Sequence, residues 1–150
     1  MNGLEIRTPA TIFDMADLGG ARTAMHWAVL KEMHQNGLTW FVSFDGAPLG
    51  LFGIYPESQE LAEAWFNVQP NAGLHLLRLV RAMRLTLNSL HYREIVTICG
   101  TPEGGRVAKA IGFSPSGFCK IGEIWKWTHL QAEADDAQRS SKPNSSSAAV

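Results

Sequence analysis

The pattern of apolar and polar positions changes its period several times along the chain, and each change predicts an element. The stretch "LEIR" predicts a short strand over 4–7, which Thr8-Pro9 ends because the residue before a proline avoids the helical region. A short helix is predicted over 11–18, before Gly19-Gly20. A second helix is predicted over 21–36, closed by Gly37, because five apolar residues share one helix face: Ala21, Met25, Ala28, Val29 and Met33.

Residues 38–69 have the character of antiparallel strands. The stretch "LTWFVSF" is rich in aromatic and β-branched residues, Asp45-Gly46 suits the tight turn of a hairpin, and "PLGLFGIY" returns. After a turn at "PESQE", the stretch "LAEAWFNV" predicts a third strand. We therefore expect a three-stranded meander.

The carboxyl-terminal half predicts two helices and three strands. A long amphipathic helix is expected over 71–93, with Asn71 as its N-cap and an apolar face made of Leu76, Val80, Met83, Leu87 and Leu90. The continuous apolar run "EIVTICG" predicts a buried strand. A short helix follows, with Thr101 as its cap and Gly112 at its end, and "GFCKI" and "EIWKWTHL" predict two strands joined at Gly122.

Aromatic residues gather in the meander, and alternation cannot place all of them on one face of a sheet. Some are therefore expected to be exposed, and an exposed aromatic patch indicates a protein partner. Trp125 and Trp127 share one face of the last predicted strand and suggest the same role. The seven meander residues are Trp40, Phe41, Phe44, Phe52, Tyr55, Trp65 and Phe66.

Composition sets the limits of the domain. The chain has 150 residues, of which 45% are hydrophobic and 18% charged, and its formal net charge of -1 gives no whole-molecule reason to expect nucleic acid or an acidic membrane as partner. From Gln131 the sequence has no aromatic residue and no large aliphatic residue except the final valine. We expect one domain over 1–130 and a disordered tail over 131–150. The sequence has neither a secretory-signal pattern nor a membrane-span run, so we expect a soluble, intracellular protein.

The order of these elements, together with two motifs, resembles the GNAT superfamily (Gcn5-related N-acetyltransferases). The motifs are "FNVQPNAGLHLLRLVRAM", in which V-x-P precedes the long helix, and "GGRVAKAIGF", which is similar to the family's late helix. The resemblance covers roughly residues 4–128. It implies an α/β (α+β) fold with a mixed central sheet flanked by helices, and it implies acetyl-CoA as cosubstrate if the protein is active.

The sequence departs from the family where the cosubstrate's pyrophosphate would bind. In the family, a turn with the pattern Arg/Gln-x-x-Gly-x-Gly/Ala follows V-x-P, and its backbone N–H groups cradle the pyrophosphate. In the stretch "NAGLHLLR" after Pro70, Gly73 is the only glycine, and the family's glycines, counted without gaps, fall on Leu74, Leu76 and Arg78. If a gap is placed instead, the loop is mostly deleted. Leu74, Leu76 and Leu77 are expected to fill the space of the loop. The resemblance leaves Val68, Gly73, Leu74 and Arg78 as cofactor-binding candidates, with Arg78 for a residual phosphate contact.

A second departure concerns the general acid. The family often carries a tyrosine four residues before the glycine of the late helix, where it protonates the leaving thiolate. That position is Ala108 here, and alanine has no proton to donate. Small size, a shortened loop and the late "K-x-I-G" helix resemble the GNAT-like internal virion protein A family of short-tailed phages. That resemblance implies a role in virion assembly, with virion proteins as partners and the host cytoplasm or the virion interior as location.

Glu63 is the best candidate for a general base. Alternation places it on one strand face with Leu61, Trp65 and Asn67, and in many family members a carboxylate in this region deprotonates the amine. The simpler alternative is a solvent-facing strand residue, which is the commoner outcome. Glu57 and Glu60 lie in a predicted turn and are expected to be plain surface residues.

Other chemical groups carry weaker signals. His75, Arg78, Arg81 and Arg84 form a basic stripe on the long helix, which suits phosphate, nucleic acid or an acidic protein surface, although a solvated helix face is the commoner explanation. Cys99 has no nearby base and is expected to be a packed core thiol. No metal site is predicted, because no metal-binding spacing occurs among His26, His34, His75, His91 and His129.

Three functions remain open from the sequence. The leading interpretation is a degenerate acyltransferase that acts as a structural or interaction protein, in a phage particle or its assembly. The alternative is an active acyl-CoA-dependent N-acetyltransferase with an unusual phosphate site and Glu63 as base. The third is an adaptor whose basic helix contacts nucleic acid.

Overall fold

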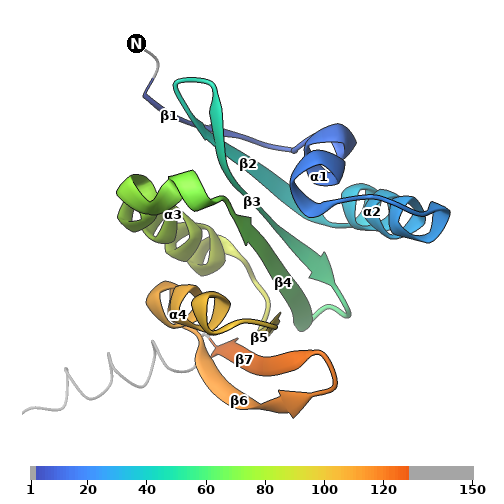
Figure 1. Cartoon of the computed structure of the whole chain (residues 1–150). Coiled ribbons are helices and arrows are strands. Elements are labelled where there is room, and N and C mark those ends of the chain that lie inside the picture. Colours follow the sequence, from blue (N-terminus) through green and yellow to red (C-terminus); the bar gives the residue numbers. More distant parts are fainter. Residues whose placement is uncertain (1–2, 129–150) are drawn as a thin grey trace, which may run out of the picture.

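The computed structural model describes residues 3–128, which form one seven-stranded mixed sheet with the strand order β1-β2-β3-β4-β5-β7-β6 (Figure 1). Every neighbouring pair is antiparallel except β4 and β5, which are parallel. This confirms the predicted α/β class. The strands are β1 (Leu4–Arg7), β2 (Leu38–Phe44), β3 (Ala47–Pro56), β4 (Leu61–Val68), β5 (Glu94–Cys99), β6 (Ser114–Cys119) and β7 (Gly122–Thr128). The tail predicted over 131–150 lies outside the described residues.

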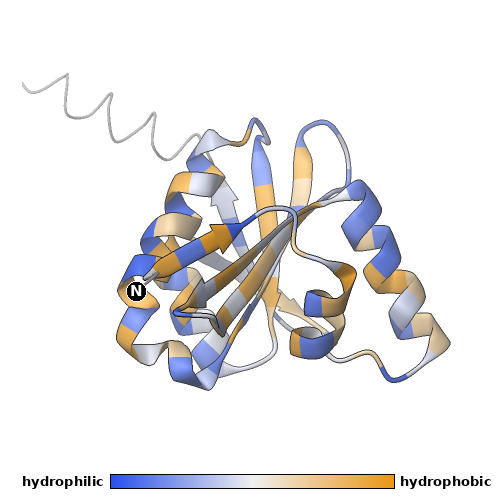
Figure 2. Cartoon of the chain, turned by 90° about the horizontal axis from the view of Figure 1, so that it is seen from above, coloured by the Kyte–Doolittle hydropathy of each residue, from blue (hydrophilic) through white to orange (hydrophobic). Residues whose placement is uncertain are grey.

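Helices cover both faces of the sheet, as Figure 2 shows. One face carries α1 (Ile12–Gly19) and α2 (Ala24–Asn36), and the other carries α3 (Leu76–Ser89) and α4 (Pro102–Ile111). A 3-10 helix, η1 (Pro70–His75), connects β4 to α3. Among the described residues, no helix has the length and apolar character needed to cross a bilayer.

The predicted meander β2-β3-β4 is confirmed, and its first turn explains the choice of residues. Asp45 and Gly46 have φ angles of 47° and 81°, which are the left-handed values that a two-residue hairpin turn requires. Asp45 also accepts a hydrogen bond through Oδ1 from the backbone N–H of Gly3, at 2.9 Å, which ties the turn to the start of β1.

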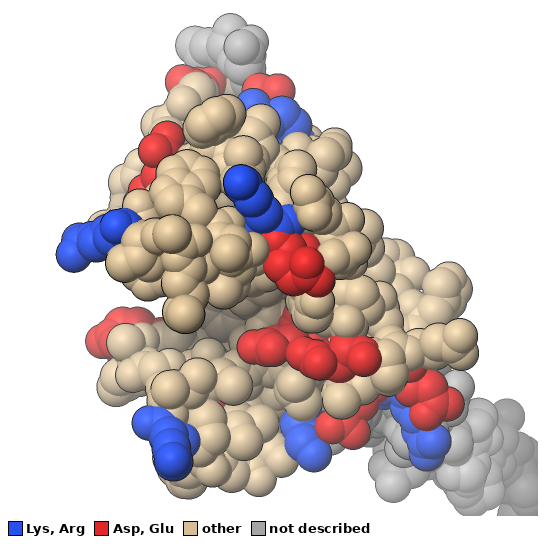
Figure 3. Space-filling view, turned by 90° about the vertical axis from the view of Figure 1, so that its right-hand side faces the viewer, with Lys and Arg blue, Asp and Glu red and all other residues tan. Residues whose placement is uncertain are grey.

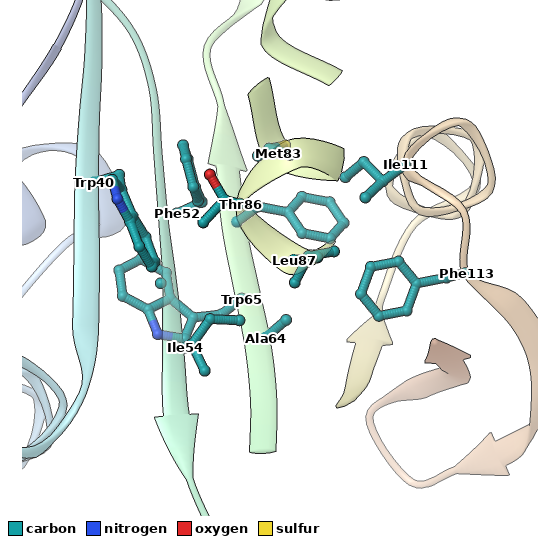
Figure 4. A pocket seen from close by; sticks show the side chains of 12 residues that line it. Trp40, Phe52, Ile54, Ala64, Trp65, Met83, Thr86, Leu87, Ile111 and Phe113 are labelled. Atoms are coloured by element: carbon teal, nitrogen blue, oxygen red, sulfur yellow. The ribbon is translucent and has the colours of Figure 1, made fainter. Parts of the chain in front are cut away.

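The main core lies between the sheet and the pair α3 and α4. The buried face of α3 consists of Leu79, Val80, Met83 and Leu87, in agreement with the predicted helix period. Trp125 and Trp127 belong to this core, with exposed fractions of 7% and 8%, so the predicted exposed tryptophan patch on β7 is wrong. A cavity of about 20 Å³ lies in this core. Figure 4 shows the side chains that line it, most of them apolar, such as Phe52, Leu87 and Phe113.

A smaller core lies on the opposite face, under α1. Met15 of α1 is fully buried against Leu51 of β3. The chain before α1 is fixed by Thr39 of β2, whose Oγ1 accepts a hydrogen bond from the backbone N–H of Ala10 at 3.0 Å. Thr11 then forms a capping box with Asp14, and this box sets the first residue of α1.

Helix α2 differs from its prediction. It begins at Ala24 with Thr23 as N-cap, so Ala21 lies outside it, and it has no buried residue. Met25 and Val29, which belong to the predicted apolar face, are 76% and 52% exposed. The apolar residues do share a face, but that face borders an open pocket instead of a closed core.

The junction between β4 and α3 also differs. Asn71 is not an N-cap, because Pro70–His75 form the 3-10 helix η1, whose hydrogen bonds span three residues, as from Ala72 N to Gln69 O at 3.0 Å. Helix α3 therefore starts only at Leu76 and ends at Ser89, within the predicted range 71–93. At the other end of the chain, β6 begins at Ser114, three residues before the predicted strand "GFCKI".

Candidate functional site

The parallel strands β4 and β5 separate partway along their length. They pair only from Leu61 to Glu63 on β4, opposite Glu94 to Val96 on β5. In residues 3–128, no strand pairs with the β5-facing edge of β4 beyond Glu63, which leaves this edge open to a ligand. A cleft of about 470 Å³ opens there, lined by Phe66, Asn67, Val68, Gln69, Pro70, Gly73, Leu76, Thr101, Glu103, Gly104 and Val107.

The cleft contains two of the four residues predicted to bind a cofactor. Val68 and Gly73 line it, whereas Leu74 and Arg78 do not. Leu74 is 96% exposed, and Leu77 is 73% exposed, so these two leucines do not fill the space of a phosphate loop as predicted. Leu76 alone of the three leucines faces the cleft.

The cleft fits one part of coenzyme A and not the other. Its mostly apolar walls and the open edge of β4 suit an extended pantetheine arm. No lysine, arginine or histidine lines it, and its carboxylate, Glu103, pairs with Arg106 at 3.2 Å. The N–H of Ala72 in η1 is bonded to Gln69 O, and the N–H of Leu76, the first residue of α3, is bonded to Gly73 O. These two N–H groups are therefore not available to cradle a pyrophosphate.

The position of the family's general acid lies in the core. Ala108 is fully buried, and the side chain that α4 presents to the cleft at the neighbouring position is Val107. Tyr55 and Tyr92 are the two tyrosines of the chain, and neither lines the cleft. A departing thiolate would therefore take its proton from water or from another group at the open mouth.

A second pocket, of about 520 Å³, lies on the opposite face of the sheet between α2 and the β3–β4 connection. Figure 3 shows a hollow on this side of the molecule with acidic side chains along its rim. The lining residues are Met25, Ala28, Val29, Glu32, Met33, Tyr55, Glu57, Glu63 and Trp65. We call it the acidic pocket. Three carboxylates and no cationic side chain line it, so it favours a positively charged ligand.

One of the three carboxylates is already bonded within the protein. Glu32 Oε1 accepts hydrogen bonds from Tyr55 Oη at 2.8 Å and from Asn36 Nδ2 at 2.7 Å. The bond to Glu32 raises the pKa of Tyr55, because a tyrosine that donates to a carboxylate holds its proton more tightly. In residues 3–128, the side chains of Glu57 and Glu63 make no hydrogen bond or ion pair.

Glu63 lies on β4, three residues before Phe66, which is the first residue of this strand that lines the cleft. It lines the acidic pocket and is also the last residue of β4 that pairs with β5 before the cleft opens. Burial raises the pKa of its carboxyl group, and the negative charge of Glu57 raises it further. A carboxylate with a raised pKa is a stronger base, and such groups are common at reaction centres.

Sequence reasoning found Glu63 but missed its surroundings. Glu57 was expected to be plain surface; it is exposed, but it lines the acidic pocket and shifts the pKa of Glu63. Trp65 forms a wall of the pocket because Gly53, its partner on β3, leaves room: a Cβ at position 53 would lie 2.3 Å from Trp65 Cζ2. The sequence did carry one signal for the acidic pocket, which is the apolar face of α2 that contains Met25 and Val29. The helix buries no residue, and this face lines the pocket.

The thiol of Cys99 is buried in the core as predicted, and burial raises its pKa.

No model of a protein family matches this sequence, and no curated protein matches it either. Solved structures do match. The acetyltransferase from Streptococcus agalactiae is 13% identical, with a TM-score of 0.64 over 85% of this chain and 99% of that one. The N-acetyltransferase PseH of Campylobacter jejuni, in complex with acetyl coenzyme A, is 12% identical, with a TM-score of 0.58 over 84% and 99%.

A third match is the spermidine N-acetyltransferase of Vibrio cholerae in complex with CoA and spermine, which is 14% identical with a TM-score of 0.58 over 84% of this chain and 94% of that one. This chain has the GNAT fold. The fold expectation from the sequence is thereby confirmed. At these identities the likeness covers the fold alone, and the chemistry has to be argued from this chain's own residues.

Proposed function

We propose that this protein transfers an acyl group from a pantetheine-type thioester to an amine. The observation that carries the proposal is the place of Glu63, which lines the acidic pocket at the point where β4 leaves β5 and the cleft begins. A thioester lying in the cleft and an amine lying in the acidic pocket would meet beside this carboxylate. The leading interpretation from the sequence, a degenerate enzyme, does not account for a carboxylate with a raised pKa on the strand that borders both pockets.

The reaction needs little from the protein beyond position and a base. Glu63 accepts a proton from the ammonium group, directly or through water, and frees the nitrogen lone pair. The nitrogen attacks the thioester carbonyl carbon, a C–N bond forms, the nitrogen gives up its second proton to water, and the C–S bond breaks. The thiolate leaves with the electron pair of the C–S bond and is protonated from solvent at the open cleft. Holding the two reactants in one geometry supplies much of the acceleration.

The acidic pocket indicates the class of acceptor. Glu57 and Glu63 attract an ammonium group, while Met25 and Val29 offer exposed apolar surface to a hydrocarbon chain. An aliphatic amine with more than one charge, or a lysine side chain, combines both properties. The Vibrio cholerae structure with spermine is a neighbour of this kind.

The test is a product assay with the full chain. Acetyl-S-pantetheine is the donor, and spermidine, putrescine and a lysine peptide are the acceptors. We expect acetylated amine by mass spectrometry and thiol release in equal amounts, both lost in Glu63→Gln. Absence of product with every acceptor would count against the proposal.

A second candidate is a scaffold without catalysis, the structural role in a phage particle that the sequence resemblance implies. It is favoured by the cleft, which holds neither a phosphate cradle nor a tyrosine. In that case the protein would co-purify with particles, and neither acetyl-S-pantetheine nor an amine would be consumed. Host cytoplasm or virion interior would be its location.

A further inference from the structure

The outward side of η1 and α3 is an unusual mixture of apolar and basic residues. Leu74, Leu77 and Leu85 are 96%, 73% and 67% exposed. Between and beside them Arg78, Arg81 and Arg84 are exposed as well. We call these six residues the α3 surface. Exposed leucines grouped on one helix are characteristic of a surface that binds a partner.

The charge of this surface is uncompensated. No acidic residue occurs from 64 to 93, and none of the three arginines forms an ion pair within residues 3–128. Arginine suits a protein partner, because its planar guanidinium group binds carboxylates through two hydrogen bonds. The partner indicated by this surface is therefore acidic, with apolar side chains among its carboxylates.

The α3 surface adjoins the cleft. Gly73 and Leu76 line the cleft, and the residue that follows each of them, Leu74 and Leu77, belongs to the α3 surface. A separate groove of about 330 Å³ lies on α3, lined by Leu77, Val80, Arg81, Arg84, Leu85 and Asn88. A protein seated there could place a flexible arm of its own into the cleft.

We propose that the α3 surface docks an acidic carrier protein, which delivers the acyl group on its phosphopantetheine arm. This inference rests on the proposed function and names its donor. The cleft suits a pantetheine arm but offers no glycine-rich cradle for the phosphates of free coenzyme A. A carrier-bound donor explains this combination. With a carrier, the phosphate is attached to the partner, and the energy of donor binding comes from the α3 surface. The thiol released by the reaction stays on the carrier.

Two other occupants of the α3 surface are possible outcomes. One is the acidic stretch of this chain that contains Glu133, Asp135 and Asp136. The other is a second copy of the chain. The carrier is favoured over both because it alone explains why the surface lies beside a cleft that fits its arm.

The experiment compares donors and docking variants in the full-length protein. The probe is a purified acyl carrier protein loaded with an acetyl group, beside acetyl-CoA and acetyl-S-pantetheine. The docking variant is Arg81→Glu with Arg84→Glu. The matched control is Arg22→Glu with Lys31→Glu, which makes the same charge change at exposed positions before and within α2. Transfer to spermidine is measured, together with binding of the loaded carrier by fluorescence anisotropy.

We expect kcat/KM for the carrier thioester to exceed that for acetyl-CoA by about 100-fold or more, as docking adds binding energy that free coenzyme A lacks. The docking variant should lower carrier-dependent kcat/KM by about tenfold or more and weaken anisotropy binding equally, because charge reversal turns attraction into repulsion. Its rate with acetyl-S-pantetheine should stay within about twofold of wild type, since neither Arg81 nor Arg84 lines the cleft that holds this donor. The control variant should change neither rate.

Equal or better use of acetyl-CoA would overturn this proposal and leave the proposed function standing. If no donor supports transfer, the proposed function fails, and anisotropy then decides the docking alone: binding that the docking variant abolishes supports it, and no binding overturns it. Self-association lost in the docking variant, without carrier binding, would assign the surface to a second copy. Carrier binding that appears only after Glu133→Gln, Asp135→Asn and Asp136→Asn would assign it to the acidic stretch.

Discussion

At the level of single residues, the environment that suits Glu63 to act as a base also lowers the stability of the folded protein. Burial and Glu57 raise its pKa above the ordinary 4.5, so between 4.5 and the raised value the folded state binds more protons than the unfolded state. Stability attributable to this group therefore falls as pH rises through that window. At neutral pH the carboxylate of Glu63 therefore lowers the stability of the folded state.

We expect Glu63→Gln to raise the melting temperature at pH 7 while it removes activity. The gain should shrink toward zero as the pH falls below 4.5, where the wild-type carboxyl group is protonated in both states. Thermal unfolding from pH 3.5 to 8 measures this. Glu60→Gln, at an exposed carboxyl group outside the pocket, should leave stability within about 0.5 kcal/mol of wild type. A lower melting temperature for Glu63→Gln at pH 7 would contradict this account of its environment.

Gly53 is the residue whose absence of a side chain shapes the acidic pocket. Gly53→Ala would place a Cβ 2.3 Å from the Trp65 ring, and we expect a loss of about 1–3 kcal/mol because both strands are fixed by pairing. Urea denaturation measures the loss. The matched control is Gly73→Ala, since a Cβ there meets nothing within 4 Å. Equal effects of the two substitutions would show that Trp65 is not held against Gly53.

The residue scale is also where sequence reasoning stopped short. Strand alternation was enough to place Glu63 beside Trp65. It could not place Glu57, because a turn has no period from which to infer a direction. Counting back from Gly112 found Ala108, but only the packing of α4 shows that this position lies in the core.

At the scale of elements, the cleft depends on how α4 begins. Thr101 is the N-cap of α4, with its Oγ1 accepting a hydrogen bond from the backbone N–H of Gly104 at 3.1 Å, and both residues line the cleft. Thr101→Val keeps the shape of the side chain and removes the acceptor. We expect a loss of about 1 kcal/mol, which Thr101→Ser restores. Urea denaturation of the two variants checks this, and an unchanged stability of the valine variant would mean that the cap contributes nothing.

Helix α2 serves the acidic pocket more than the core. Met25→Ser with Val29→Ser should therefore change stability by less than about 1 kcal/mol, since both side chains are already largely exposed. The same change should raise KM for an aliphatic amine several-fold, because it removes apolar surface from the pocket. Steady-state kinetics and thermal unfolding measure the two effects.

The control for this variant is Lys31→Ser with Gln35→Ser, two exposed positions of α2 that do not line the pocket. It should leave KM unchanged. A large stability loss in the Met25 and Val29 variant, or an equal KM change in the control, would show that this helix face is structural.

A helix, strand or turn was predictable where its sequence pattern is compatible with only one local structure. The hairpin at Asp45-Gly46 and the buried face of α3 agree with expectation, because a turn needs particular residues and a helix face a particular period. The start of α3 was not predictable, since Pro70 permits either an α-helix or the 3-10 helix that forms. The role of α2 was not predictable either. An apolar helix face indicates burial, but the sequence does not show whether the protein core or a ligand covers that face.

At the scale of the whole molecule, the separation of β4 from β5 creates the site. Pairing between β4 and β5 stops at Glu63. As a result, the earlier part of β4 borders the acidic pocket through Glu63 and Trp65, and its last residues, 66–68, border the cleft. The order of elements predicted the sheet. It could not predict where the pairing would stop, because that depends on helices packed on both faces and on no local sequence signal. In the proposed function, the cleft and the acidic pocket together form one reaction centre beside Glu63.

The most direct test of this claim is the pH dependence of kcat/KM for acetyl transfer to spermidine. The base form of Glu63 increases with pH, so the wild-type rate should rise through an acid limb whose midpoint lies above 4.5. Glu57→Gln removes one cause of the raised pKa and should move that limb to lower pH, and Glu63→Gln should abolish it. An acid limb that stays in place in both variants would show that another group is the base and that the two pockets do not meet at Glu63.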